Sequence, residues 1–233
     1  MPSPVDALAA RARVWLARHR QQTAYALGGF ASAILNTLFK LFNVALFTSV
    51  VGIHPGSFYL GHLVYGLWNA VNDPAFGFLL DRMGGMRLKV IQYGGPAWCA
   101  TFMVTWYPWS YDGGSWLAFL HFLTSMFCFD GFLTLVLMVK CALLADLCVD
   151  SKQRNELNNF SAWASLAGSG LAMTSYYVWD PNNLTVFRAL AAALSAVSAA
   201  AWWFSGKQMV MPSRSEDERQ RLVLDPQIFI QAY

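Results

Sequence analysis

Oxygen ligands recur at helical spacing within one apolar stretch of the sequence. Asn69, Asp73 and Gly77 are four residues apart, so on an α-helix they lie along one stripe. Pro74 has no N–H, and the carbonyl of Ala70 therefore loses its helical partner beside that stripe. A carboxylate, a carboxamide and a free carbonyl are the hard oxygen ligands that a small cation or a proton requires.

The stretch that contains these ligands, Phe58–Leu80, is long and apolar enough to cross a bilayer, which takes about 20 residues. A charge near the bilayer centre costs about 2.5–3.5 kcal/mol even on the lenient insertion scale, so a carboxylate there needs an explanation. One interpretation is an ion-coupling site, formed by Asp73, Asn69, Asn72 and the Ala70 carbonyl. The other is a polar patch that joins this helix to a neighbour, with the proline as a simple kink.

The composition is typical of a polytopic membrane protein. Hydrophobic residues make up 56% of the chain and charged residues only 12%, against about 25% charged in soluble domains. The net charge of +3 is too small to indicate a nucleic-acid partner. The cysteines fall in or beside apolar runs without zinc-ligand spacing, so we expect buried reduced thiols, no bound metal, and no cofactor apart from a transported Na⁺ or H⁺. They are Cys99, Cys128, Cys141 and Cys148.

Six apolar segments separated by turn residues predict an all-α protein with six transmembrane helices, because a helix satisfies its own backbone hydrogen bonds in lipid. We place them at Thr23–Val51, Phe58–Leu80, Leu88–Trp109, Ser115–Val139, Asn158–Trp179 and Leu184–Phe204. The bundle would cover residues 23–204, between an amphipathic flank (1–22) and a polar tail (205–233). Trp202 and Trp203 are typical of an aromatic belt at the membrane surface.

The basic residues between these segments predict the orientation of an integral, multi-pass membrane protein. Lys and Arg lie in the N-terminal flank, the second and fourth loops and the tail, while the first, third and fifth loops have none. The positive-inside rule therefore places both termini in the cytoplasm, in the plasma membrane or an endomembrane. Asn183, in an Asn-Leu-Thr sequon, would then face outward as a glycosylation acceptor.

Polar residues in the other apolar segments are candidate solute contacts. Asn36 and Lys40 lie in the first segment, and Asp130 lies in the fourth. Lys40 has two interpretations. It extends toward the lipid headgroups or supports packing, or it is a cation that alternates with a coupling ion as the partner of Asp73 or Asp130.

Residues 72–82, Asn-Asp-Pro-x-x-Gly-x-x-x-Asp-Arg, resemble the second-helix motif of the melibiose-permease-like branch of the major facilitator superfamily. This branch comprises the glycoside–pentoside–hexuronide:cation symporters and their eukaryotic relatives. Tyr25-Ala-Leu-Gly-Gly-Phe30 is similar to the opening of the family's first helix, and Asp130 to its fourth-helix aspartate. The resemblance implies a solute contact at Asp130 and a cytosolic gating motif at Asp81, Arg82, Asp150 and Arg154.

The sequence also departs from the family pattern. The family's second helix has two carboxylates four residues apart, whereas the first is Asn69 here. The sugar-binding aspartate of the first helix falls at about Ala33, and the arginine of the fifth at about Ala162. The resemblance therefore implies H⁺- or Na⁺-coupled symport of a small organic solute, sugar-like or lipid-like, and leaves the ion and the solute open.

Transporters of this superfamily have two six-helix halves, with the solute bound between them near the midplane. Six segments correspond to the N-terminal half of such a fold, so we expect a partner in the lipid membrane, either a second half-transporter or a second copy in a homodimer. The alternative is a non-transporting half-size protein that acts as a scaffold or as a partner of a full-length transporter. An enzyme is not expected, because His54, His62 and His121 have no paired nucleophile or metal spacing.

The orientation can be tested with epitope tags in intact cells. We expect a tag after Tyr233 to be protected from external antibody and protease, and a tag in the third loop, at residues 111–114, to be accessible. The physical reason is the absence of Lys and Arg from the loops placed outside. Labelling of the Tyr233 tag from outside would reverse the predicted topology.

Overall fold

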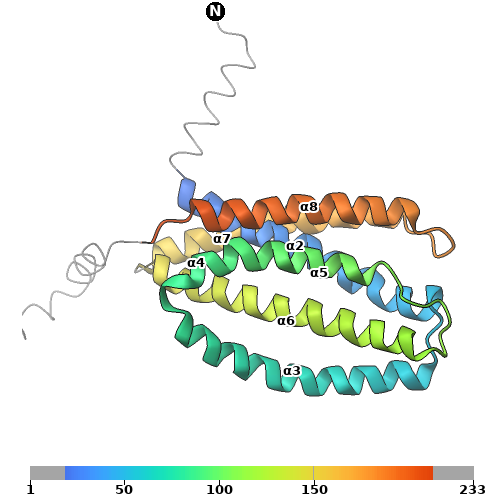
Figure 1. Cartoon of the computed structure of the whole chain (residues 1–233). Coiled ribbons are helices and arrows are strands. Elements are labelled where there is room, and N and C mark those ends of the chain that lie inside the picture. The colour runs from blue at the N-terminus through green and yellow to red at the C-terminus, as the bar shows by residue number, and fades with distance from the viewer. Residues whose placement is uncertain (1–18, 149, 212–233) are drawn as a thin grey trace, which may run out of the picture.

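The structure is a computed structural model that describes residues 19–148 and 150–211. All regular elements in these two ranges are helices, and the long ones lie alongside one another (Figure 1). They are α2 (Arg20–Ala45) with the π-helical turn η1 (Leu46–Val50), α3 (Pro55–Met83), the short elements η2 (Gly84–Met86), α4 (Arg87–Lys89) and η3 (Val90–Gly94) that lead into α5 (Gly95–Thr105), α6 (Trp116–Leu147), α7 (Ser151–Met173) with η4 (Thr174–Tyr177), and α8 (Thr185–Gln208).

These helices overlap the six predicted segments, although α7 begins at Ser151 and not at Asn158, and the all-α prediction is confirmed. The prediction of six crossings is supported only in part. Three helical stretches in the described residues are long and apolar enough to cross a membrane: Arg20–Val50, Trp116–Leu147 and Thr185–Gln208. The helices of the other three predicted segments, α3, α5 and α7, fall outside this set. α5 has only 11 residues, and α7 begins with a polar turn, Ser-Lys-Gln-Arg. α6 and α8 extend beyond their predicted ends at Val139 and Phe204.

The helices pack in a fixed set of neighbours. α2 lies against α7 and α8, and α5 lies against α6 and α8. α3 packs mainly against α6 and forms one edge of the bundle (Figure 1). The two ends of the described chain meet, because Gln21 Nε2 donates to the Val210 carbonyl at 2.9 Å and the Val210 N–H donates to Gln21 Oε1 at 3.1 Å. The first and last described residues therefore lie at the same end of the bundle.

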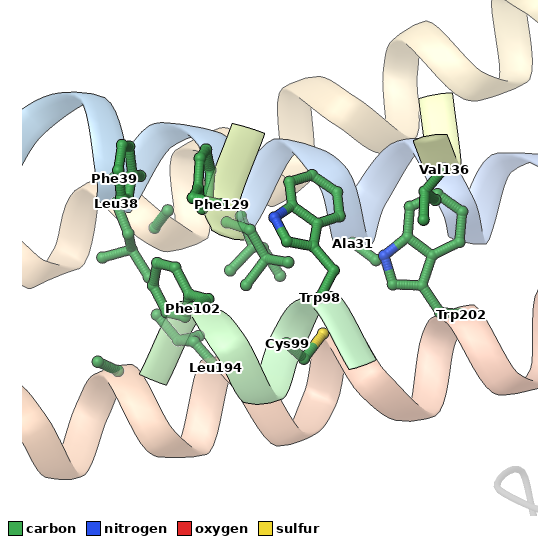
Figure 2. Close-up of a cluster of buried hydrophobic side chains, with 14 of the residues drawn as sticks. Ala31, Leu38, Phe39, Trp98, Cys99, Phe102, Phe129, Val136, Leu194 and Trp202 are labelled. Carbon is green, nitrogen blue, oxygen red and sulfur yellow. The ribbon is translucent and has the colours of Figure 1, made fainter. Parts of the chain in front are cut away.

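An aromatic core fills the space where α2, α5, α6 and α8 meet (Figure 2). Phe129 of α6 stacks on Phe39 of α2 with ring centroids 3.7 Å apart, and it lies 5.4 Å from Trp98 of α5. Trp202 of α8 is fully buried beside Trp98. The expectation that Trp202 belongs to a surface belt is therefore wrong, whereas Trp203 is partly exposed. The ring of Trp202 is buried because Gly95 of α5 has no side chain and leaves room for it.

The four cysteines are free, as expected, but they are not all buried. Cys99 and Cys148 are buried, Cys128 is half-buried and Cys141 is exposed. Burial raises the pKa of the Cys148 thiol, while nearby Arg154 opposes that shift. The prediction of burial is wrong for Cys141, because this residue lies on an exposed face of α6 although most of its sequence neighbours are apolar.

Small residues set the close contact between α2 and α7. A Cβ atom added at Gly168 of α7 would lie 2.5 Å from the Phe30 carbonyl oxygen of α2. Gly29 of α2 lies in the same way against Ser161 and Ser165 of α7. This is the ordinary role of small residues between membrane helices.

Two glycines of α7 should therefore respond in opposite directions to alanine. Gly168→Ala should lower the free energy of unfolding by about 1–3 kcal/mol, because the helices must separate. Gly170→Ala should be neutral or raise it by about 0.5–1 kcal/mol, because no atom lies within 4 Å of the new methyl group and alanine favours the helix. Thermal unfolding in mild detergent measures both variants. Equal effects would show that the α2–α7 contact is not as close as described.

Candidate functional site

Asp130 lies in the middle of α6 and is only 6% exposed. Its carboxylate accepts two hydrogen bonds from α3: Tyr65 Oη donates to Oδ1 at 2.9 Å, and Asn72 Nδ2 donates to Oδ2 at 2.6 Å. Tyr65 and Asn72 are two helical turns apart, so both side chains point from one face of α3. Each carboxylate oxygen thus has a donor, which offsets the cost of burying the group.

Asp73 follows Asn72 in α3, and its surroundings are different. It is exposed, and its Oδ1 accepts one long hydrogen bond, 3.4 Å, from Thr134 Oγ1 of α6. Thr134 lies one turn after Asp130. The α3–α6 contact therefore contains two carboxylates side by side, one enclosed and one open. We call Tyr65, Asn72, Asp73, Asp130 and Thr134 the polar seam.

The structure divides the predicted ion-coupling residues. Asn72 is buried and bonded to Asp130, so it belongs to the predicted solute contact as much as to the ion site. Asn69 is half-buried and makes no side-chain hydrogen bond in the described residues, and Ala70 is exposed. In the same part of the chain, no group of three or more His, Cys, Asp or Glu side chains could hold a metal ion.

The first helix does not supply a cation to the polar seam in this structure. Lys40 is exposed and makes no salt bridge with any residue that the structure describes, and Asn36 is half-buried. The neighbouring Asn43, which is buried, donates to the sulfur of Met126 in α6 at 3.2 Å. The pairing of Lys40 with Asp73 or Asp130 therefore remains a prediction.

At the predicted cytosolic end, the charged residues pair differently from the expected motif. The salt bridge that the structure contains between residues 19 and 211 joins Arg87 to Asp146, near the ends of α3 and α6. Asp81 is exposed, and the guanidinium of Arg82 lies 4.1 Å from the ring centroid of Phe78.

The second half of the predicted gating motif lies around the start of α7. Arg154 donates to the Cys148 carbonyl at 3.4 Å, and Asp150 precedes α7 without a side-chain cap. At the opposite end of the bundle, Asn183 is exposed and its side chain accepts a hydrogen bond from the Thr185 N–H at 3.1 Å.

Sequence reasoning missed three members of this site: Tyr65 and Thr134 in the polar seam, and Asp146 as the partner of Arg87. Tyr65 had a signal, because it lies two turns before Asn72 on the same helical face. Asp146 had a weaker one, as an acidic residue in the last turn of an apolar helix. In each of these contacts the two side chains come from segments far apart in the sequence. Their pairing therefore depends on how the helices are aligned.

An apolar crevice of about 260 Å³ lies beside the polar seam, also between α3 and α6. It is lined by Trp68, Phe76, Phe127, Cys128, Gly131, Phe132 and Leu135. The ring of Trp68 stacks on Phe127 with centroids 5.1 Å apart. Because no charged side chain lines the crevice, the polar seam is the better candidate for binding an ion or a polar solute.

Long apolar helices, one of which encloses the carboxylate of Asp130, define an integral membrane protein with a polar site inside an apolar stretch that can cross a membrane. The chain belongs to the MFS/sugar transport protein family, whose model matches residues 24–223. The resemblance to the melibiose-permease-like branch is thereby confirmed.

The curated relatives agree with this assignment. Transmembrane protein 180 from Mus musculus is 34% identical over 203 residues, which are 80% of this chain and 38% of that protein. The Gallus gallus protein of the same name is 34% identical over 182 residues, 71% of this chain and 35% of the relative. An uncharacterised symporter from Synechocystis is 28% identical over 161 residues, 66% and 29% of the two chains. The matches thus span between 29% and 38% of the length of these relatives.

The hydrogen bonds to Asp130 can be tested by comparing two asparagines of α3. Asn72→Leu should lower the free energy of unfolding by about 1–3 kcal/mol, because a buried carboxylate oxygen loses its donor. Asn69→Leu, one turn earlier, should have little effect, because Asn69 makes no side-chain hydrogen bond among the described residues. Thermal unfolding of both variants in detergent is the measurement. A stable Asn72→Leu protein would mean that Asp130 does not depend on the Asn72 donor, since Tyr65 of α3 would still donate to its other oxygen.

Proposed function

We propose that the chain is the N-terminal half of a cation-coupled secondary transporter for a small organic solute. Family membership and the symporter among the relatives support transport. The observation that carries the proposal is the polar seam, which holds an open carboxylate, Asp73, next to an enclosed one, Asp130. Carboxylates at membrane depth are expensive and mark ion or solute pathways.

Asp73 is the coupling residue in this proposal. It is exposed and accepts only one long hydrogen bond, so most of its lone pairs are available to a cation. Asn69, one turn earlier on α3, would add a neutral oxygen ligand and not a second charge. A single carboxylate neutralises one monovalent cation, and it attracts Na⁺ less than a pair would. The site therefore favours H⁺ over Na⁺ as the coupled ion.

Asp130 is the solute-facing residue in this proposal. Its two hydrogen bonds from α3 fix the direction of the carboxylate. A solute hydroxyl that donated to Asp130 would replace the donor of Tyr65 or Asn72, and it would thereby loosen α3 from α6. Solute binding at Asp130 and ion binding at Asp73 would then act on the same helix pair.

The exposed apolar faces of α3 and α7 are where we place the partner of this half. On α3, Leu63, Leu67 and Val71 are each 64% exposed, and on α7, Trp163 and Leu166 are 73% and 63% exposed. Contiguous apolar surface of this kind is covered by protein or by lipid. A second six-helix half, or a second copy of the chain, would cover it and enclose the polar seam.

The coupling assignment predicts opposite effects for two substitutions in α3. Asp73→Asn should abolish accumulation against a gradient while the protein stays folded, because the cation loses its charged ligand. Asn69→Asp should strengthen Na⁺ dependence, because it rebuilds a pair of carboxylates one turn apart. The measurement is uptake of a radiolabelled glycoside panel by the transporting assembly under imposed Na⁺ and H⁺ gradients.

A readout without solute completes this test. Na⁺ should raise the thermal stability of Asn69→Asp more than that of the parent at constant ionic strength. Asp112→Asn, in an exposed loop, serves as the control and should behave like the parent. If Asp73→Asn accumulates solute as well as the parent does, Asp73 only joins helices and the coupling proposal is wrong.

A further inference from the structure

Lys140 is a basic residue inside α6, in one of the stretches that can cross a membrane. Its Nζ donates a hydrogen bond to Ser161 Oγ of α7 at 2.8 Å and lies 4.5 Å from the ring centroid of Tyr25 in α2. One ammonium group therefore touches the side chains of two other helices.

No carboxylate neutralises this cation in the described residues. The only salt bridge there joins Arg87 to Asp146, and the only hydrogen bond of Lys140 is to a neutral hydroxyl. A lysine at the centre of a membrane helix costs about 2.5–3.5 kcal/mol on the insertion scale, and one nearer a helix end, as Lys140 is, costs less. A desolvated cation–π contact returns about 2 kcal/mol of this, and the charge itself remains unbalanced.

The close contact of α2 with α7 builds the surroundings of Lys140. The lysine stem passes Gly28 of α2, where an added Cβ would lie 3.4 Å from Lys140 Cε. The missing side chain of Gly29 makes room for the hydroxyls of Ser161 and Ser165. An ammonium and two hydroxyls thus gather over two glycines.

The hydrogen bond from Lys140 to Ser161 joins α6 to α7, two helices that pack mainly against other helices. α6 packs against α3 and α5, whereas α7 packs against α2. In the described part of the chain, Lys140 to Ser161 is the only side-chain hydrogen bond between α6 and α7. The ammonium is therefore directed away from the core of its own helix group and toward α7.

We propose that Lys140 and Ser161 form an anion-binding site for a phosphate or carboxylate group of the transported solute. An ammonium has three N–H donors, and one of them is used on Ser161. The two others, together with the hydroxyl hydrogen of Ser161, can donate to the oxygens of one anion. The site rests on the proposed transport function, because it specifies the charge of the solute.

The test uses the purified chain in nanodiscs of neutral phosphatidylcholine and a matched pair of probes. Glucose 6-phosphate, but not glucose, should raise the midpoint of thermal unfolding at constant ionic strength. Lys140→Met should abolish this shift, and Lys140→Arg should retain it because the positive charge remains. Lys207→Met removes an exposed lysine in the last turn of α8 and should leave the shift unchanged.

Ser161→Ala keeps the charge and removes one hydrogen-bond partner, so it should weaken the apparent affinity for glucose 6-phosphate by about 3- to 10-fold. This variant decides the question if Lys140→Met fails to fold. An equal shift in the parent and in Lys140→Met, or no shift in the parent, would overturn the site.

A second arm separates a solute from a lipid headgroup. Nanodiscs that contain phosphatidylglycerol present the same anionic chemistry from the bilayer. A shift with phosphatidylglycerol and none with glucose 6-phosphate would assign the site to lipid and overturn the solute proposal. The anion shift should persist in Asp73→Asn, so failure of ion coupling at Asp73 and failure of the anion site give different results.

Discussion

The pair of hydrogen bonds from α3 to Asp130 is the interaction on which the proposed site depends. α3 has α6 as its main neighbour, and its face toward α6 carries Tyr65 and Asn72. The buried carboxylate needs these donors, and the helix needs the carboxylate as its anchor. Asp73 comes into register with Thr134 only because the adjacent residue is fixed in this way. The position of Asp73 thus follows from the hydrogen bonds that α3 donates to Asp130.

The other half of the bundle is held by a different kind of contact. α2 meets α7 through glycine and serine, close enough that a methyl group would not fit at Gly168. Such contacts gain from packing and resist sliding. A polar seam, by contrast, can exchange its donors for those of a ligand. The bundle therefore combines a closely packed pair, α2 with α7, and a polar pair, α3 with α6, which in the proposed function would respond to ligands.

The sequence predicted the helices because apolar runs and turn residues are local signals. It also indicated Asp130 and the motif around Asp73 as candidate binding residues, since a charge within an apolar run is conspicuous. It did not predict the partners. Tyr65, Thr134 and Lys140 owe their roles to the alignment of helices that are distant in the sequence, and no local pattern specifies that alignment. Trp202 illustrates the same limit, because only the gap at Gly95 in another helix reveals that its ring is buried.

The one-sided packing of α3 has a consequence for how the protein is made. By length and hydropathy, α3 is not among the helices that can cross a membrane unaided, whereas α6 is. Its amide and phenol find their partner in Asp130, 58 and 65 residues later in the chain. During synthesis α3 therefore emerges before α6, the helix that carries the acceptor for these two donors. We therefore expect the stable integration of α3 into the membrane to depend on α6, which supplies the acceptor for both of its donors.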